Sequence, residues 1–169
     1  MHDEPVERTP ALTHVDETGA ARMVDVSAKA VTARTASAGA RVELSPAAYE
    51  LVYDGRLPKG DALGVARIAG IMASKKTPEL IPLCHPIALS GVVVDVICID
   101  GAIRIVATVH TTDRTGVEME ALTAVAVAGL AVIDMVKGVD PEARLTDVEV
   151  LTKAGGLHGD WVRGQDRSL

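Results

Sequence analysis

The chain has 169 residues and a formal net charge of −6, and it is 48% hydrophobic but only 2% aromatic. This length fits one domain with a sizeable core, and the composition is ordinary for a globular protein. Nucleic-acid binding is disfavoured, because the chain has neither a basic stripe nor a supply of aromatic rings for stacking bases. We expect a flexible tail at residues 1–11, a single domain at residues 12–161 and a second flexible tail at residues 162–169.

The first half of the chain carries signals for one strand and two helices. A short strand is predicted at residues 41–44. Ser45 and Pro46 are typical of an N-cap and a first helical residue, and Gly55 stands where a C-cap glycine belongs, so a helix is predicted between them. A second helix is predicted over residues 61–76, because its apolar residues recur at helical spacing.

The second half begins with a hairpin. Two runs rich in Val and Ile, residues 91–99 and 103–110, flank an Asp-Gly pair, which is a strong signal for a tight turn between antiparallel strands. A long helix is predicted over residues 117–137, with apolar residues around nearly its whole circumference. Residues 145–151 alternate like a final strand.

This order of elements predicts an α+β fold, a ferredoxin-like sandwich of an antiparallel sheet with helices. A helix that is apolar on all sides must be covered on more than one side. We therefore expect the sheet to cover one face of the helix at 117–137 and a second subunit to cover another, which makes the protein oligomeric.

The compartment is expected to be the cytoplasm. Two cysteines do not make the disulfide framework of a secreted domain, and the first residues lack the apolar segment of a signal peptide. No uncharged apolar stretch reaches the ~18 residues of a membrane span, so no membrane association is expected.

Two loops contain candidates for binding or catalysis. Lys59 precedes a predicted helix start, where free N–H groups and the helix dipole favour anions, although spacing alone favours a solvated loop lysine, because such loops are common. His85 is held between two prolines and could donate a hydrogen bond or carry a proton, or it could simply bond to the backbone. Cys84 lies beside it, but no second Cys/His pair exists to complete a zinc site, so no metal site is predicted.

The long helix carries candidates at both ends. Thr115 and Glu118 have the spacing of a capping box, which would by itself account for Glu118 but not for Glu120. Near the other end, Asp134 interrupts an apolar helix and has Lys137 three residues later. We expect Asp134 to be at least partly buried and either paired with Lys137 in a structural ion pair or tuned for acid–base work.

Seven segments of the chain, taken together and in this order, resemble the molybdenum cofactor biosynthesis protein C family, the cyclic pyranopterin monophosphate synthases. The resemblance covers about residues 12–161, and LIPLCHP and GVEMEALTA are its most specific parts. The segments are MVDVSAK (23–29), PKGD (58–61), ARIAGIMASKKT (66–77), LIPLCHP (80–86), TGVEMEALTA (115–124), DMVK (134–137) and KAGGLHGD (153–160).

The resemblance implies an activity and an assembly. It implies a lyase that converts (8S)-3',8-cyclo-7,8-dihydroguanosine 5'-triphosphate to cyclic pyranopterin monophosphate and pyrophosphate. It further implies a homohexamer, a trimer of dimers, with active sites at subunit interfaces. No cofactor is implied, although Mg²⁺ could accompany the triphosphate.

The resemblance also implies roles for individual residues. Asp134, Lys137 and Lys59 match catalytic positions of the family. The residues that match substrate-binding positions are Leu83, Cys84, His85, Glu118, Met119, Glu120, Lys29, Lys75 and Lys153.

Three other functions fit the sequence less well. A sensor for an anionic nucleotide or pterin would need the lysines but has little use for a carboxylate at Asp134. An inactive assembly subunit should have lost the motifs, and a metal-dependent hydrolase lacks clustered ligands.

Overall fold

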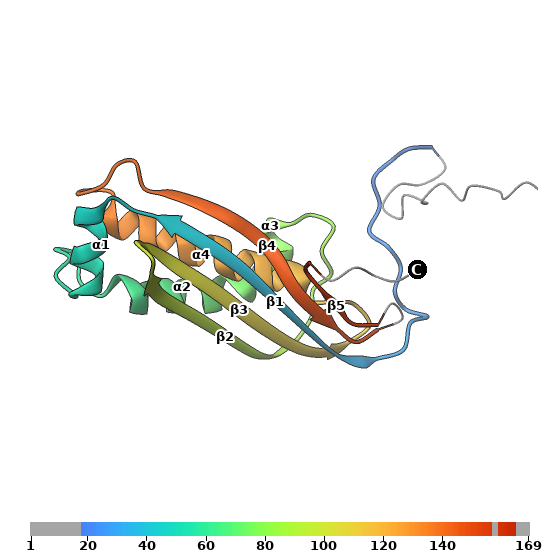
Figure 1. Ribbon diagram of the computed structural model, residues 1–169. Coiled ribbons are helices and arrows are strands. Elements are labelled where there is room, and N and C mark those ends of the chain that lie inside the picture. The colour runs from blue at the N-terminus through green and yellow to red at the C-terminus, as the bar shows by residue number, and fades with distance from the viewer. Residues whose placement is uncertain (1–17, 157–158, 165–169) are drawn as a thin grey trace, which may run out of the picture.

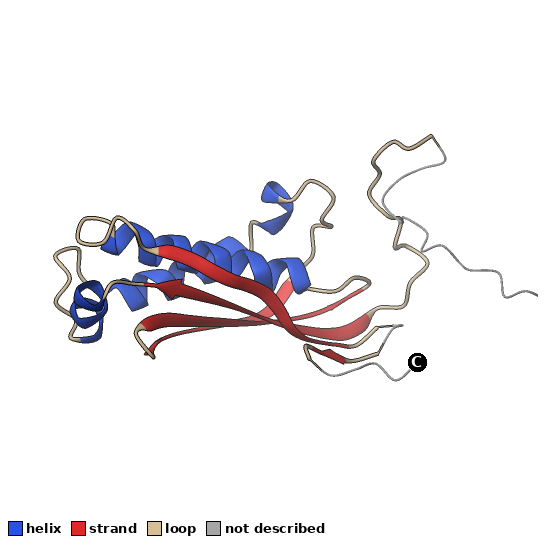
Figure 2. Ribbon diagram, turned by 45° about the horizontal axis from the view of Figure 1, so that its top comes forward, coloured by secondary structure: helices blue, strands red, loops and turns tan. Residues whose placement is uncertain are grey.

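The computed structural model describes residues 18–156 and 159–164, which fold into two layers. One layer is an antiparallel sheet, and the other consists of helices that cover one face of it (Figures 1 and 2). The α+β class predicted from the sequence is therefore confirmed. The elements are β1 (Thr32–Glu43), α1 (Pro46–Tyr53), α2 (Ala62–Ser74), α3 (Thr77–Leu80), β2 (Leu89–Ile99), β3 (Ala102–Asp113), α4 (Glu118–Val136), β4 (Arg144–Ala154) and β5 (Trp161–Val162).

The described strands lie in the order β2-β3-β1-β4-β5, and every neighbouring pair is antiparallel. β2 and β3 form the predicted hairpin. Asp100 and Gly101 at its turn have φ angles of 49° and 73°, as a type I′ turn requires. The expected tail at residues 1–11 lies outside the described residues, and the expected start of the second tail, residue 162, falls within β5.

β1 is much longer than the strand predicted at residues 41–44. Ala36, Ala38, Ala40 and Val42 face the core and are at most 5% exposed. Their alternation with Ser, Gly and Arg is a weak strand signal, because alanine and glycine have little intrinsic preference for strands. The strand forms because β3 and β4 pair with it on both sides.

The two long helices, α2 and α4, approach each other closely. A Cβ atom added at Gly70 of α2 would lie 2.9 Å from the carbonyl oxygen of Ala124 and 3.3 Å from the Cβ of Ala128, both on α4. Only a glycine allows this distance without displacing backbone. The core below these helices is built from small aliphatic side chains, and Ile103 and Ile105 are its largest fully buried members.

By length and composition, α4 could cross a membrane. However, 56% of its most apolar 18-residue window is buried inside the structure, where it contacts α2 and the strands β1, β3 and β4. Core helices of globular proteins meet the same length and composition criteria. Its apolar circumference is explained, in part, by this central position.

The predicted start and end of α1 are confirmed in atomic detail. The Ser45 hydroxyl accepts a hydrogen bond from the N–H of Ala48 at 3.4 Å. Gly55 has a φ of 66°, and the N–H groups of Gly55 and Arg56 bond back into the last turn, as in a Schellman motif. α2 begins in the same way, with the Asp61 carboxylate accepting from the N–H of Gly64 at 2.9 Å. These caps define both ends of the loop that joins α1 to α2.

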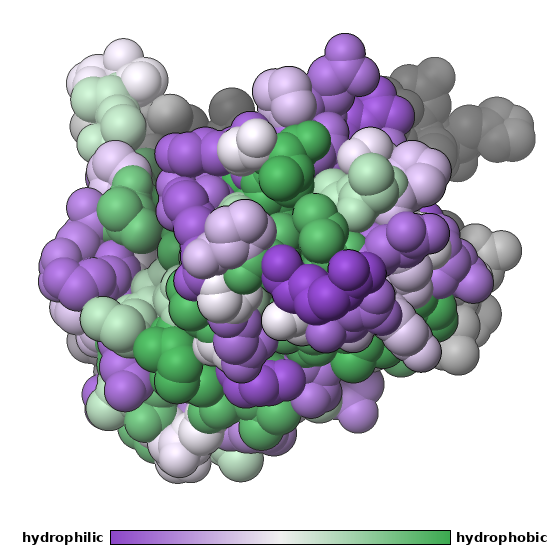
Figure 3. Space-filling view, turned by 90° about the vertical axis from the view of Figure 1, so that its left-hand side faces the viewer, coloured by the Kyte–Doolittle hydropathy of each residue, from purple (hydrophilic) through white to green (hydrophobic). Residues whose placement is uncertain are grey.

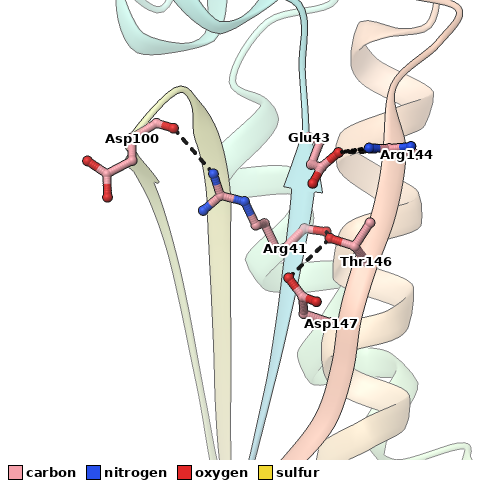
Figure 4. A network of polar contacts seen from close by, with 6 residues as sticks. All are labelled: Arg41, Glu43, Asp100, Arg144, Thr146 and Asp147. Carbon is pink, nitrogen blue, oxygen red and sulfur yellow. Dashed lines mark hydrogen bonds and ion pairs between the residues drawn. The ribbon is translucent and has the colours of Figure 1, made fainter.

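Polar contacts join the strands at the end of the sheet next to α1 (Figure 4). Arg144 of β4 donates to the Glu43 carboxylate of β1, with Nε and Oε2 2.6 Å apart. Arg41 of β1 donates to the carbonyl of Asp100 in the β2–β3 turn at 3.3 Å. β1 is thus linked by side chains to β4 and to the β2–β3 turn at this end.

Candidate active site

The predicted site residues form two groups at opposite ends of α4. Lys59, Asp134 and Lys137 meet at its C-terminal end, on the side of the molecule where α1 lies (Figure 1). Glu118 and its neighbours surround the N-terminal end. An α-helix rises about 1.5 Å per residue, so Glu118 and Asp134 are about 24 Å apart along the helix axis.

Asp134 lies between two ammonium groups. The Nζ atom of Lys137 is 2.7 Å from Asp134 Oδ1, and the Nζ atom of Lys59 is 3.1 Å from Oδ2. Lys59 also donates to the main-chain carbonyl of Asp134 at 2.7 Å. Both lysines therefore form ion pairs with a single carboxylate at the last turn of α4, where positive charges also interact favourably with the helix dipole.

The loop between α1 and α2 brings Lys59 to this carboxylate. Leu57 is buried and anchors the loop on the core. Gly60 has a φ of 96°, a conformation that glycine adopts without strain, and Asp61 then caps α2. Lys59 is thereby held between a buried anchor and a tight turn. One interpretation of the sequence placed Lys59 in an anion site at the start of α2. In the structure its ammonium group instead contacts Asp134 on α4.

Hydrogen bonds from Lys137 and Lys59 lower the pKa of Asp134 below its usual value. The carboxylate is thus ionised at neutral pH and can accept a proton. The expectation that Asp134 is partly buried is wrong for the single chain, because its side chain is 57% exposed. It stands at the last turn of the helix, which reaches the end of the sandwich. Figure 3 faces this end and shows hydrophilic residues interspersed with hydrophobic ones.

The predicted capping box at the start of α4 is wrong. Val117 is the N-cap residue, and no side chain caps the helix there. The Glu118 carboxylate instead pairs with Lys153 of β4, with Oε1 and Nζ 3.1 Å apart. Gly116 makes room for this, since a Cβ atom there would collide with the Glu118 carboxylate. Glu118 is therefore oriented by a strand rather than by its own helix.

A polar pocket with a volume of about 160 Å³ adjoins this pair. Lys29, Arg34, Arg114 and Lys153 line it, and Glu118 is the one carboxylate among the described residues that line it. Arg34 donates to the carbonyls of residues 113 and 114, and Arg114 donates to the carbonyl of Lys29, each at 3.0 Å. Four cations and one carboxylate give this pocket a net positive charge, which suits a multiply charged anion, and we call it the basic pocket.

Arg34 and Arg114 were missed as site residues by the sequence analysis. Arg34 belongs to the part of β1 that was not predicted to be a strand, so nothing placed it near the others. Arg114 precedes the TGVEMEALTA segment by one residue and would have been found by extending that motif. The pairing of β1 with β3 brings the two arginines together.

Cys84 and Glu120 contact each other under the first turn of α4. The Cys84 thiol donates to Glu120 Oε1, with sulfur and oxygen 3.4 Å apart. Glu120 is only 1% exposed, and its Oε2 atom has no hydrogen-bond partner in the described structure. Burial raises the pKa of the Glu120 carboxyl and raises that of the Cys84 thiol to about 11. The thiol is consequently protonated and unreactive at neutral pH.

His85 is oriented by the segment that precedes β1. Its Nε2 atom lies 2.7 Å from the carbonyl oxygen of Val24, and because a carbonyl only accepts, Nε2 carries a proton. His85 and Val24 line a hollow of about 520 Å³ together with Arg114. Of the other predicted binding residues, Leu83 is half-buried, and Met119 and Lys75 are exposed.

Within residues 18–156 and 159–164, no three His, Cys, Asp or Glu side chains are grouped closely enough to hold a metal ion. The chemical groups brought together by the fold are instead ammonium, guanidinium, carboxyl and imidazole groups. These can move protons and bind anions.

Known proteins resemble this chain over most of its length. The model of the MoaC family matches residues 23–156. Cyclic pyranopterin monophosphate synthase of Streptomyces avermitilis is 65% identical over 90% of this chain and 89% of its own length. The synthases of the same name from Nocardioides sp. and Thermomicrobium roseum are 64% and 55% identical, over 90% and 93% of this chain and 95% and 96% of their own lengths. The chain belongs to the MoaC family.

Proposed function

We propose that this enzyme converts (8S)-3',8-cyclo-7,8-dihydroguanosine 5'-triphosphate to cyclic pyranopterin monophosphate and pyrophosphate in molybdenum cofactor biosynthesis. The reaction makes it a phosphorus–oxygen lyase. Relatives that are 55% to 65% identical bear the name of this activity. The observation that carries the proposal is the Asp134 carboxylate held between the ammonium groups of Lys59 and Lys137.

This group of three suits the proton transfers of the rearrangement. The guanine-derived ring must open and a new ring must close, so protons leave some atoms and reach others. Asp134 is ionised at neutral pH and can accept a proton, and the adjacent ammonium group of Lys59 or Lys137 can return one as an acid. A general acid–base pair contributes about a hundredfold to ten-thousandfold to a rate.

The basic pocket at the other end of α4 suits the phosphates. To form the cyclic phosphate, a sugar hydroxyl attacks the α-phosphorus, a base takes the hydroxyl proton, and the bond to the β-phosphate breaks to release pyrophosphate. Lys29, Arg34, Arg114 and Lys153 would stabilise the charge of this leaving group. Hydrogen bonds to backbone carbonyls fix Arg34 and Arg114, and the ion pair with Glu118 fixes Lys153, before any ligand arrives.

A single chain does not bring the two groups together. They are about 24 Å apart along α4, which exceeds the reach of any two side chains. We therefore propose that each complete site joins the Asp134 end of one chain to the basic pocket of another. The exposure of Asp134, Lys59 and Lys137 in the single chain supports this, because a partner could cover them.

A homohexamer built as a trimer of dimers would supply such interfaces. The helix layer has an apolar outer surface that supports association, since Val65, Ile68 and Met72 follow each other at helical spacing on α2 and are exposed, as is Leu130 on α4. We also assign the fold to the ferredoxin-like type. The sheet order β2-β3-β1-β4, with helices inserted after β1 and after β3, supports this assignment.

The proposed reaction needs no redox step, so we propose that the enzyme works without an organic cofactor in the cytoplasm, on a small nucleotide-derived substrate rather than on nucleic acid or at a membrane. Mg²⁺ could enter with the triphosphate as part of the substrate.

The test is turnover of the cyclic dihydroguanosine triphosphate by the wild-type protein and by Asp134→Asn. Pyrophosphate release and the fluorescence of the oxidised pterin would be followed together. Turnover by the wild type that falls at least a hundredfold in the variant, with substrate binding retained, supports the proposal. Tight binding without turnover by the wild type would show a sensor instead of an enzyme. Near-normal turnover by the variant would remove Asp134 from the mechanism.

A further inference from the structure

Trp161 on β5 lies next to the basic pocket. β5 pairs with the end of β4 so that Trp161 is opposite Lys153. Side chains of directly opposed residues in an antiparallel pair lie on the same face of a sheet. Lys153 reaches Glu118 at the start of α4, so the indole lies on the helix side of the sheet, beside this ion pair.

The indole is supported from one side by Arg163. The guanidinium carbon is 5.5 Å from the centre of the ring system, in a cation–π contact. Arg163 is itself held in place, because its Nε donates to the carbonyl of Val150 at 2.6 Å and pairs with Glu149 at 3.2 Å. One face of the ring is thus occupied by a fixed cation, which leaves the remaining surface of this half-buried side chain for other contacts.

Trp161 lines a hollow of about 390 Å³, together with Glu118, Val150 and Lys153. The volume is within the range of small-molecule sites. Glu118 and Lys153 line both this hollow and the basic pocket, so the two spaces adjoin. A molecule with a charged tail and a flat ring could occupy both at once.

No other Trp, Tyr or Phe side chain of this chain lies beside the basic pocket to stack on a ring. The chain has one Trp, two Tyr and no Phe. Tyr49 and Tyr53 stack on each other on α1, at the opposite end of the molecule (Figure 1). Stacking at the basic pocket of this chain therefore depends on Trp161 alone.

We propose that the indole of Trp161 forms a stacking subsite for a flat, purine-like ring whose phosphates lie in the adjoining basic pocket. This inference rests on the proposed function, since it names the residue that contacts the ring of the same substrate. The binding energy of such a contact does not depend on hydrogen-bond pattern, so the platform would hold the ring system both before and after its rearrangement.

Two commercially available ligands separate the ring contact from the phosphate contact. GTP carries a purine ring and a triphosphate, whereas inorganic tripolyphosphate carries the phosphates only. Binding of both would be measured by calorimetry with the wild type, Trp161→Phe and Trp161→Leu. Val162→Ala is the matched control, because it truncates a side chain that is 39% exposed on the same strand, next to Trp161 but on the opposite face of the sheet.

We expect Trp161→Leu to weaken GTP binding about tenfold, Trp161→Phe to weaken it less, and both to bind tripolyphosphate like the wild type. Because Trp161 is the only tryptophan, its fluorescence in the wild type should also change with GTP and not with tripolyphosphate. The Michaelis constant for the cyclic dihydroguanosine triphosphate should rise with the GTP dissociation constant.

Equal GTP binding and an equal Michaelis constant in Trp161→Leu and wild type would overturn the subsite. So would a loss that is the same for GTP and tripolyphosphate, because it would show damage to the phosphate pocket. If Trp161→Leu does not fold, a wild-type tryptophan fluorescence that does not change on addition of GTP would overturn the subsite instead. If the wild type turns over the substrate in any of these cases, only the stacking subsite is refuted. If binding depends on the ring but no turnover occurs, the subsite is supported and the proposed reaction is refuted.

Discussion

Two impaired variants should restore activity to each other if the site is built from opposite ends of α4 in two chains. Asp134→Asn damages the end with Lys59 and Lys137, and Lys153→Gln damages the basic pocket. The first should lower turnover by about a hundredfold or more through loss of the base. The second removes a charged contact to phosphate, which costs about 1.5–3 kcal/mol, or about tenfold to a hundredfold at low substrate concentration.

The expected recovery follows from the geometry. Asp134 lies about 24 Å along α4 from Glu118, the ion-pair partner of Lys153, so the two changed side chains cannot belong to the same site of the same chain. In an assembly that contains both variants at equal amounts and at random, about a quarter of the composite sites receive an intact half from each chain. Activity per site should therefore rise to about a quarter of the wild-type value, which exceeds the roughly one-tenth or less left in Lys153→Gln alone and is far above Asp134→Asn alone.

The assay is pyrophosphate release by co-expressed, differently tagged chains, with mixed assemblies confirmed by mass spectrometry. Asp134→Asn mixed with Lys59→Gln is the matched control, because both changes damage the same end and no combination of chains repairs it. If mixed assemblies form but the Asp134→Asn and Lys153→Gln mixture is no more active than the control mixture, the composite site is refuted.

Three further predictions concern the core and the buried groups. Gly70→Val should lower the free energy of unfolding by about 1–3 kcal/mol in a urea titration, because the new side chain meets the Ala124 carbonyl, whereas Gly138→Ala, with open space around it, should change it little. Cys84 should react with iodoacetamide at pH 8 about a hundredfold more slowly than a free cysteine, because its thiol pKa is raised to about 11; fast labelling seen by mass spectrometry in the folded protein would contradict this. Burial raises the pKa of Glu120 above 4.5, so its contribution to stability is present at acidic pH and is lost as the pH rises through the raised value. Thermal melts should show the wild type losing stability relative to Glu120→Gln over that rise, and parallel pH profiles would count against it.

Local signals predicted the parts of the fold that local interactions determine. The caps of α1 and the Asp-Gly turn between β2 and β3 depend on residues a few positions apart, and both are confirmed. β1 depends on pairing with β3 and β4, which lie far away in sequence, and most of it was missed for that reason. β5 is only two residues long and was missed as well.

The site could be predicted as a set of residues but not as an arrangement. The resemblance to the family supplied the residues, and spacing along one helix correctly suggested that Asp134 pairs with Lys137. Spacing gave the wrong partner for Glu118, because Lys153 reaches it from another strand. The separation of Asp134 from the basic pocket appears only once α4 is seen as a single straight element of 19 residues.

The position of α4 between two half-sites has a consequence for the whole assembly. Each chain would help to build two active sites, one with each end of the same helix. A substitution that disturbs the middle of α4 would then impair two active sites, although the substituted residue is in neither of them. In mixed assemblies, the fraction of activity lost would therefore exceed the fraction of altered chains. Substitutions in α4 would have a dominant negative effect, although most of this helix contacts no substrate.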